Sequence, residues 1–155
     1  MPNEASPTTP VLDEEDLFRS VRDDPQCFGW DASRKALRLS HSSFNDPDKQ
    51  PSVDRAGLQS SGPQATRFTE TDGVVVMTAS QVRAVRGLKT CDAKGRALHD
   101  HDVDVHHAPE EHNYSHALIK TVPQAVSDGT FKRLKEALCR IAEGRGWAYP
   151  PDSLR

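Results

Sequence analysis

The residues best suited to chemistry gather in one short stretch of the chain, 99–116. Six of the seven histidines fall there: His99, His101, His106, His107, His112 and His116. Aspartates and glutamates stand between them. Imidazole titrates near neutral pH and is a common ligand for metal ions. The stretch therefore points to proton transfer or to metal binding.

The first half of this stretch has the pattern of a β-strand. Within 98–107 the odd-numbered residues, His99 and His101 among them, would share one face, because side chains alternate along a strand. The H-x-H spacing would let two imidazoles reach one divalent metal ion, although no standard zinc signature is matched. We therefore consider metal binding by His99 and His101 against the simpler alternative of a solvated loop.

The second half contains the two histidines that we expect to matter most. His112 and His116 stand four residues apart, but Asn113 follows His112 where a metalloprotease helix needs glutamate, so that class is rejected. Residues 116–122 predict a strand that would hold His116 partly buried at its start. If the protein is an enzyme, we expect His107 or His116 to be its general acid or base. The alternative is that both are structural histidines, hydrogen-bonded in the fold.

Four further polar residues complete the predicted site, and they are Arg19, Arg38, Ser40 and Asn113. We expect them to form a polar cleft with His107 and His116, in which an arginine holds an anionic group of the substrate.

A second interpretation uses the order of arginine, serines and glutamate along the chain. Arg19, the serines of 40–43 and a later acid (Glu70, Glu110 or Glu111) stand in the order found in ADP-ribosyltransferase-like folds, which hold NAD. The simpler alternative is that Arg19 pairs with a carboxylate and the serines form turns.

The elements that must position these residues predict an α+β fold. Expected strands lie at 16–22, 36–39, 52–55, 73–78, 98–107 and 116–122, and expected helices at 81–88 and 131–143. The last helix has a clean apolar stripe, and 73–78 is a continuous apolar run typical of a buried strand. We expect one small mixed β-sheet with two or three helices in a single domain, 13–151. A polar loop is predicted at 45–65 and a disordered tail at 1–12.

Composition limits the compartments and partners. The net charge is −3 and there is no long basic run, so binding to nucleic acid is not indicated. No apolar stretch is long enough to cross a membrane, and the acidic, proline-rich start does not resemble a signal peptide. Three widely spaced cysteines without a C-x-x-C pair fit a reducing compartment, so we expect a cytoplasmic protein.

Four short motifs resemble a group of small uncharacterised bacterial proteins. They are Leu17-Phe18-Arg19, Arg38-Leu39-Ser40 to Phe44, Ser52-Val53-Asp54, and His107-Ala108-Pro109 through Asn113 to Ile119. The resemblance implies no activity. It implies that Arg38 and Ser40 belong with Arg19, and that His107, Asn113 and His116 matter more than His99 and His101.

Several functions thus stay open. The leading hypothesis is an enzyme that acts on an anionic substrate, with its cofactor unknown. The alternatives are an accessory subunit that binds a protein encoded in the same operon, a divalent-metal-binding protein, and an ADP-ribosyltransferase-like domain. In an accessory subunit the binding surfaces would be the basic helix faces and the tail at 147–151.

Overall fold

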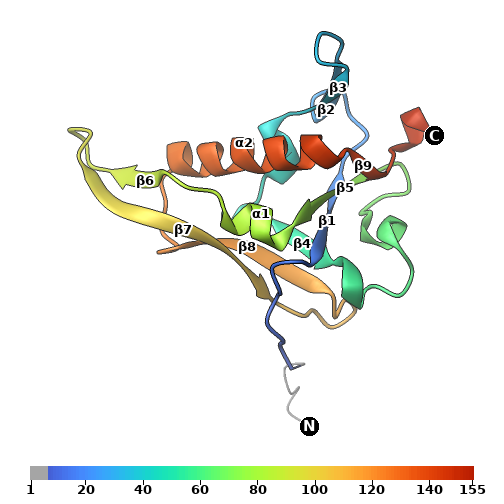
Figure 1. The fold of residues 1–155 in the computed structure, drawn as a ribbon, viewed down its shortest axis with the longest axis horizontal. Helices are drawn as coiled ribbons and strands as arrows, with labels where there is room; N and C mark the ends of the chain where they lie inside the picture. Colours follow the sequence, from blue (N-terminus) through green and yellow to red (C-terminus); the bar gives the residue numbers. More distant parts are fainter. Residues whose placement is uncertain (1–6) are drawn as a thin grey trace.

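One antiparallel sheet organises the computed structural model, which describes residues 7–155 (Figure 1). Its seven strands, in spatial order, are β6 (Leu88–Cys91), β7 (Ala97–His107), β8 (His116–Val122), β4 (Ser52–Arg55), β1 (Asp16–Val21), β5 (Gly73–Thr78) and β9 (Trp147–Tyr149). A separate hairpin pairs β2 (Phe28–Asp31) with β3 (Ala36–Leu39). The two α-helices are α1 (Ala79–Arg83) and α2 (Asp128–Arg145).

The predicted mixture of strands and helices is confirmed, but the sheet differs from the expected one. It has seven strands, every neighbouring pair is antiparallel, and the β2–β3 hairpin forms a second sheet. The expected strands correspond to β1, β3, β4, β5, β7 and β8. Three strands were not predicted, β2, β6 and β9, which have three or four residues each.

The helix ends follow local capping chemistry. The α1 helix starts two residues earlier than predicted, because Thr78 and Gln81 form a reciprocal capping box. It ends at Arg83, short of the predicted 88, and the chain turns at Gly87 with φ +79° before β6. The α2 helix continues past Gly144 and stops at Gly146, whose φ of +75° is unfavourable for other residues.

The hydrophobic core lies between one face of the sheet and α2, which runs across that face in Figure 1. Leu134 and Leu138 of α2 are fully buried, as are Leu17 of β1 and Met77 of β5, which face each other across the β1–β5 ladder. No helix within residues 7–155 has the length and apolar character of a membrane span.

The start of the described chain is bound to the sheet. Residues 1–6 of the predicted disordered tail lie outside the described residues. Thr9 donates its backbone N–H to His107 Nδ1 at 3.0 Å, Arg55 donates to the carbonyls of Thr9 and Pro10, and Val11 is buried. Residues 7–12 therefore belong to the folded body, because side chains far along the chain supply their hydrogen bonds.

Candidate functional site

A polar cavity of about 450 Å³ lies where β4 and β8 run side by side. Asp54 and His116 face each other across the two strands, and they alternate with the core residues Val53 and Ala117. They therefore lie on the face of the sheet that is turned away from the core. We call this space the β4–β8 cavity. Its lining consists of Ser20, Asp46, Ser52, Val53, Asp54, Ala65, Thr66, Arg67, Phe68, Glu110, Asn113, His116 and Leu118.

His116 has one ring nitrogen committed to the backbone and the other turned toward a carboxylate. Its Nδ1 lies 2.7 Å from the carbonyl oxygen of Ala108. A carbonyl can only accept, so Nδ1 carries the hydrogen, and in the neutral ring Nε2 holds the lone pair. Nε2 lies 3.3 Å from Oε1 of Glu110, with side-chain exposures of 16% for His116 and 61% for Glu110. The ring is thus held in one tautomer, with its basic nitrogen beside an exposed acid.

Asp54 is the buried carboxylate of the cavity and binds neutral donors. Its Oδ1 accepts from Asn113 Nδ2 at 2.8 Å, and its Oδ2 accepts from Gln59 Nε2 at 2.7 Å and Thr66 Oγ1 at 2.8 Å. These donors come from two separate segments, one after β4 and one before β8. Asp54 therefore holds the two loops that border the cavity and is a positioning residue.

A tight turn places Glu110 over His116. Glu110 and Asn113 exchange two backbone hydrogen bonds, at 3.0 and 3.1 Å. The Asn113 side chain is anchored on both sides, since its amide donates to Asp54 and its Oδ1 accepts from Ser115 Oγ at 2.6 Å. Asn113 thus fixes the turn on which Glu110 stands.

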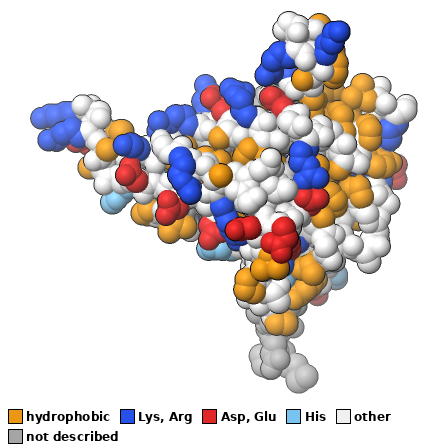
Figure 2. All heavy atoms as spheres, in the orientation of Figure 1, with side chains coloured by type: hydrophobic (Ala, Val, Ile, Leu, Met, Phe, Trp, Pro, Cys, Tyr) orange, Lys and Arg blue, Asp and Glu red, His pale blue; other side chains and the backbone are white. Residues whose placement is uncertain are grey.

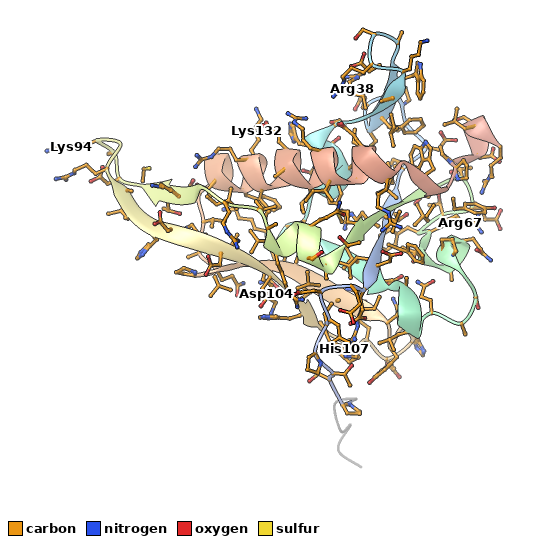
Figure 3. All side chains as sticks on the ribbon, viewed as in Figure 1. Arg38, Arg67, Lys94, Asp104, His107 and Lys132 are labelled. Atoms are coloured by element: carbon orange, nitrogen blue, oxygen red, sulfur yellow. The ribbon has the colours of Figure 1, made fainter. Side chains whose placement is uncertain are left out.

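Arg67 is the cation of the cavity lining and was not predicted. Its Nε donates to the Gln64 carbonyl at 2.9 Å and its Nη1 to the Glu70 carbonyl at 2.8 Å, while the guanidinium lies 4.9 Å from the centre of the Tyr149 ring. Figure 3 shows Arg67 at the β5–β9 side of the sheet. Within residues 7–155 its Nη2 has no hydrogen-bond partner. Arg67 lies in an irregular segment, where no periodic pattern could have indicated it.

Arg19 lies in the interior and does not line the β4–β8 cavity. It donates from Nε to the Ser43 carbonyl at 3.0 Å, from Nη1 to the Ser52 carbonyl at 2.9 Å and from Nη2 to the Asn45 carbonyl at 3.1 Å. Burial lowers the pKa of Arg19 to about 10, partly opposed by Asp46, so the side chain stays charged near neutral pH. With these donors on backbone carbonyls, Arg19 organises the loop after β3.

Arg38 and Ser40 are also away from the cavity. Arg38 is exposed on β3, with its guanidinium lying over Gly29 of the partner strand. Figure 3 shows Arg38 on the hairpin and His107 at the opposite end of the molecule. Ser40 caps the short 3-10 turn of His41–Phe44 by accepting from the Ser42 N–H at 3.3 Å. Ser40 therefore caps a local turn, which agrees with the simpler alternative that these serines form turns.

His107 uses both ring nitrogens inside the fold. Its Nδ1 accepts from the Thr9 N–H, and its Nε2 donates to the Tyr114 carbonyl at 2.6 Å. It is paired with the core residue Ala117, so it lies on the opposite face of the sheet from His116. His107 is therefore an anchor for residues 7–12, and the two predicted catalytic histidines do not converge.

His99 and His101 share a strand face as predicted, but His101 is already committed. Its Nδ1 donates to the Pro123 carbonyl at 2.7 Å, and its Nε2 accepts from Thr90 Oγ1 at 2.6 Å, while His99 is exposed with its ring centre 6.4 Å away. Over the described range 7–155, no three His, Cys, Asp or Glu side chains are grouped so that they could hold a metal ion.

The cysteines differ in reactivity. Cys139 is buried and donates to the Ser40 carbonyl at 3.3 Å, and burial raises the pKa of its thiol to about 12. Cys91 is exposed. Because the thiolate is the reactive form, we expect an aromatic disulfide reagent to label Cys91 within minutes and Cys139 only on unfolding. Mass spectrometry of the labelled peptides would check this, and fast labelling of Cys139 would contradict its burial.

Of the six predicted catalytic residues, Asn113 and His116 line one cavity and the other four do not. Asp54, Glu110 and Arg67 join them there. Comparison with protein-family models, with curated proteins and with solved structures finds no match for this chain.

Proposed function

We propose that the β4–β8 cavity binds a small polar substrate and that His116 acts on it as a general acid–base. The observation that carries this proposal is the fixed tautomer of His116, whose Nε2 faces the cavity beside Glu110. A positioned base needs its lone pair aimed at the proton that it takes, and the Ala108 carbonyl supplies that orientation.

Glu110 would accept a hydrogen bond from His116 Nε2 once that nitrogen has taken up a proton, because its Oε1 lies 3.3 Å away. Asp54 and Asn113 would keep the turn in place during this exchange, since both have their polar atoms engaged with each other and with the surrounding loops.

The charges of the lining limit the substrate. The lining contains three carboxylates, those of Asp46, Asp54 and Glu110, and one guanidinium, that of Arg67. A wholly anionic molecule would meet repulsion beside Glu110. We therefore propose a substrate whose acidic group binds Arg67, in the role first expected of Arg19 or Arg38, and whose reacting end next to His116 is neutral or rich in hydrogen-bond donors.

The cysteines also support a reducing compartment such as the cytoplasm. Cys27, Cys91 and Cys139 are all free thiols and lie on different parts of the fold.

The test of His116 compares two histidine variants. On a panel of p-nitrophenyl esters, phosphates and glycosides, we expect His116→Gln to lower kcat/KM by about 10²–10⁴-fold, the usual contribution of a general acid–base. His112→Gln is the matched control, because His112 is exposed, comes from the same turn and does not line the cavity. It should keep full activity.

Two further results decide the interpretation. A thermal melt should show that His116→Gln remains folded, because it removes one hydrogen bond worth about 1 kcal/mol. If the wild type turns over none of these substrate classes, or if both variants are equally active, His116 is not a general acid–base. A large loss of thermal stability with unchanged turnover would make it a structural residue.

A further inference from the structure

An exposed phenylalanine, Phe68, forms part of the wall of the β4–β8 cavity. It is 81% exposed, the highest fraction among the large hydrophobic residues in the described part of the chain. It also lines a second cavity of about 480 Å³, to which Arg22 and Cys27 contribute. Burying an apolar ring of this size favours folding. Because the fold leaves Phe68 in solvent, its ring remains available to a molecule that enters either cavity.

The backbone around Phe68 is held in place by hydrogen bonds to buried side chains. The Phe68 N–H donates to Ser20 Oγ at 3.2 Å, and Ser20 Oγ donates to Asp72 Oδ2 at 2.9 Å. Ser20 and Asp72 are both buried. The next residue, Thr69, donates its hydroxyl to Asp72 Oδ1 at 2.6 Å. These bonds tie the segment to β1, so the exposed ring extends from a backbone that the fold has fixed.

The residue before Phe68 provides a positive charge beside the ring. The Arg67 guanidinium lies 4.9 Å from the centre of the Tyr149 ring, and within residues 7–155 its Nη2 has no hydrogen-bond partner. Arg67 and Phe68 are consecutive, with Cα atoms about 3.8 Å apart, and both line the β4–β8 cavity. Figure 2 shows hydrophobic side chains gathered on the β5–β9 side of the molecule, the side on which Figure 3 shows Arg67. A ligand on this side therefore meets an apolar ring and a cation together.

Strand β8 adds a second apolar side chain to the cavity, next to His116. Leu118 and His116 are two residues apart, so they lie on the same face of the strand, and both line the cavity. Glu110 Oε1 lies 3.3 Å from His116 Nε2, so an acidic group of a ligand would be repelled there. The acidic end of a ligand is therefore directed to Arg67, and its apolar part to Phe68 and Leu118.

We propose that the substrate of the β4–β8 cavity is an aromatic acid. Its planar ring packs against Phe68 and its carboxylate binds Arg67, while the group that reacts lies beside His116. This inference rests on the proposed function only for the reacting group. Aromatic rings attract each other through offset or edge-to-face contacts, beyond the effect of the area that they bury, so Phe68 favours a planar ring over a saturated one. The cavity volume of about 450 Å³ is within the usual range for sites that bind small molecules.

The test titrates the full chain by ligand-observed NMR with three probes that differ from one another in one feature. The probe 2-naphthoate has both the planar ring and the acid, decalin-2-carboxylate lacks the planar ring, and 2-naphthamide lacks the charge. We expect 2-naphthoate to bind about fivefold or more tightly than either of the other two. Phe68→Ser should weaken 2-naphthoate binding by about tenfold, whereas Phe68→Tyr, which keeps a ring, should retain it.

Trp30→Ser is the matched control, because Trp30 is also an exposed aromatic residue but does not line the β4–β8 cavity, so its loss should leave the affinity for 2-naphthoate unchanged. The aromatic-acid proposal is overturned if 2-naphthoate does not bind, if the saturated acid binds as tightly, or if Phe68→Ser binds 2-naphthoate as well as the wild type. The comparison of probes uses the wild type alone, so it decides even where a variant fails to fold. These titrations involve no turnover, so an inactive His116 would overturn the proposed acid–base role and leave the binding result in force.

Discussion

Replacing Arg19 with methionine is expected to lower the free energy of unfolding by about 3 kcal/mol or more. The guanidinium donates to the backbone carbonyls of Ser43, Asn45 and Ser52, and methionine would leave all three without that partner. An unsatisfied buried acceptor costs about 1–3 kcal/mol. Methionine keeps the apolar contact with Phe44, whose ring centre is 5.6 Å from the guanidinium carbon. Urea unfolding would measure the loss.

The control for Arg19 is Arg22, an exposed arginine three residues further along the chain. Arg22→Met should change stability by less than about 0.5 kcal/mol, as surface substitutions usually do. A stable Arg19→Met protein that had lost activity would instead restore the role expected from the sequence, in which Arg19 holds an anionic substrate group.

Replacing Arg55 with methionine is expected to lower the free energy of unfolding by about 3–5 kcal/mol. The substitution removes one partner of a buried ion pair and leaves the carboxylate of the other partner uncompensated. Arg55 binds Glu15 through two bonds, Nε–Oε1 at 2.8 Å and Nη2–Oε2 at 2.9 Å, and both side chains are largely buried. The same guanidinium donates to Thr9 and Pro10. Hydrogen exchange should therefore also speed up at the amides of Thr8, Thr9 and Val11, and unchanged exchange there would contradict this anchoring role.

The Arg55–Glu15 pair also makes stability depend on pH. Burial raises the pKa of Glu15, but the hydrogen bonds from Arg55 and from the Leu12 N–H outweigh it and hold the pKa below its usual 4.5. A lowered pKa contributes stability that is complete above the unfolded value and is lost as the pH falls through the folded value. Wild-type stability should therefore fall more steeply below about pH 4.5 than that of Glu15→Gln. Equal slopes would show that the Arg55–Glu15 pair contributes little to the pH dependence of stability.

The longest regular elements could be predicted because the sequence there is long enough to show a period. The alternation in β7 placed His101, Val103, Val105 and His107 on one face, and all four are buried. The apolar stripe of α2 indicated Leu134 and Leu138, which are fully buried. Shorter strands such as β9 carry no period and depend on the strand beside them.

The candidate site could be predicted only in part. The histidine stretch directed attention to the start of β8 and the turn before it, where His116 and Asn113 line the cavity. Arg67 lies in an irregular segment and reaches the cavity only through the packing of that segment on Tyr149. Asp54 stands in a strand too short to reveal which face it would take.

The sequence by itself determined which residues alternate between the two faces of the sheet, because strand geometry turns successive side chains to opposite sides. Only the tertiary structure decided what lies over each face. Arg19 donates its hydrogen bonds to backbone carbonyls of the loop after β3 and so stabilises that loop. His116 uses only Nδ1 for a backbone carbonyl, that of Ala108, and its Nε2 faces the cavity. That difference comes from contacts between segments far apart in the chain, which a local pattern of polar and apolar residues does not record.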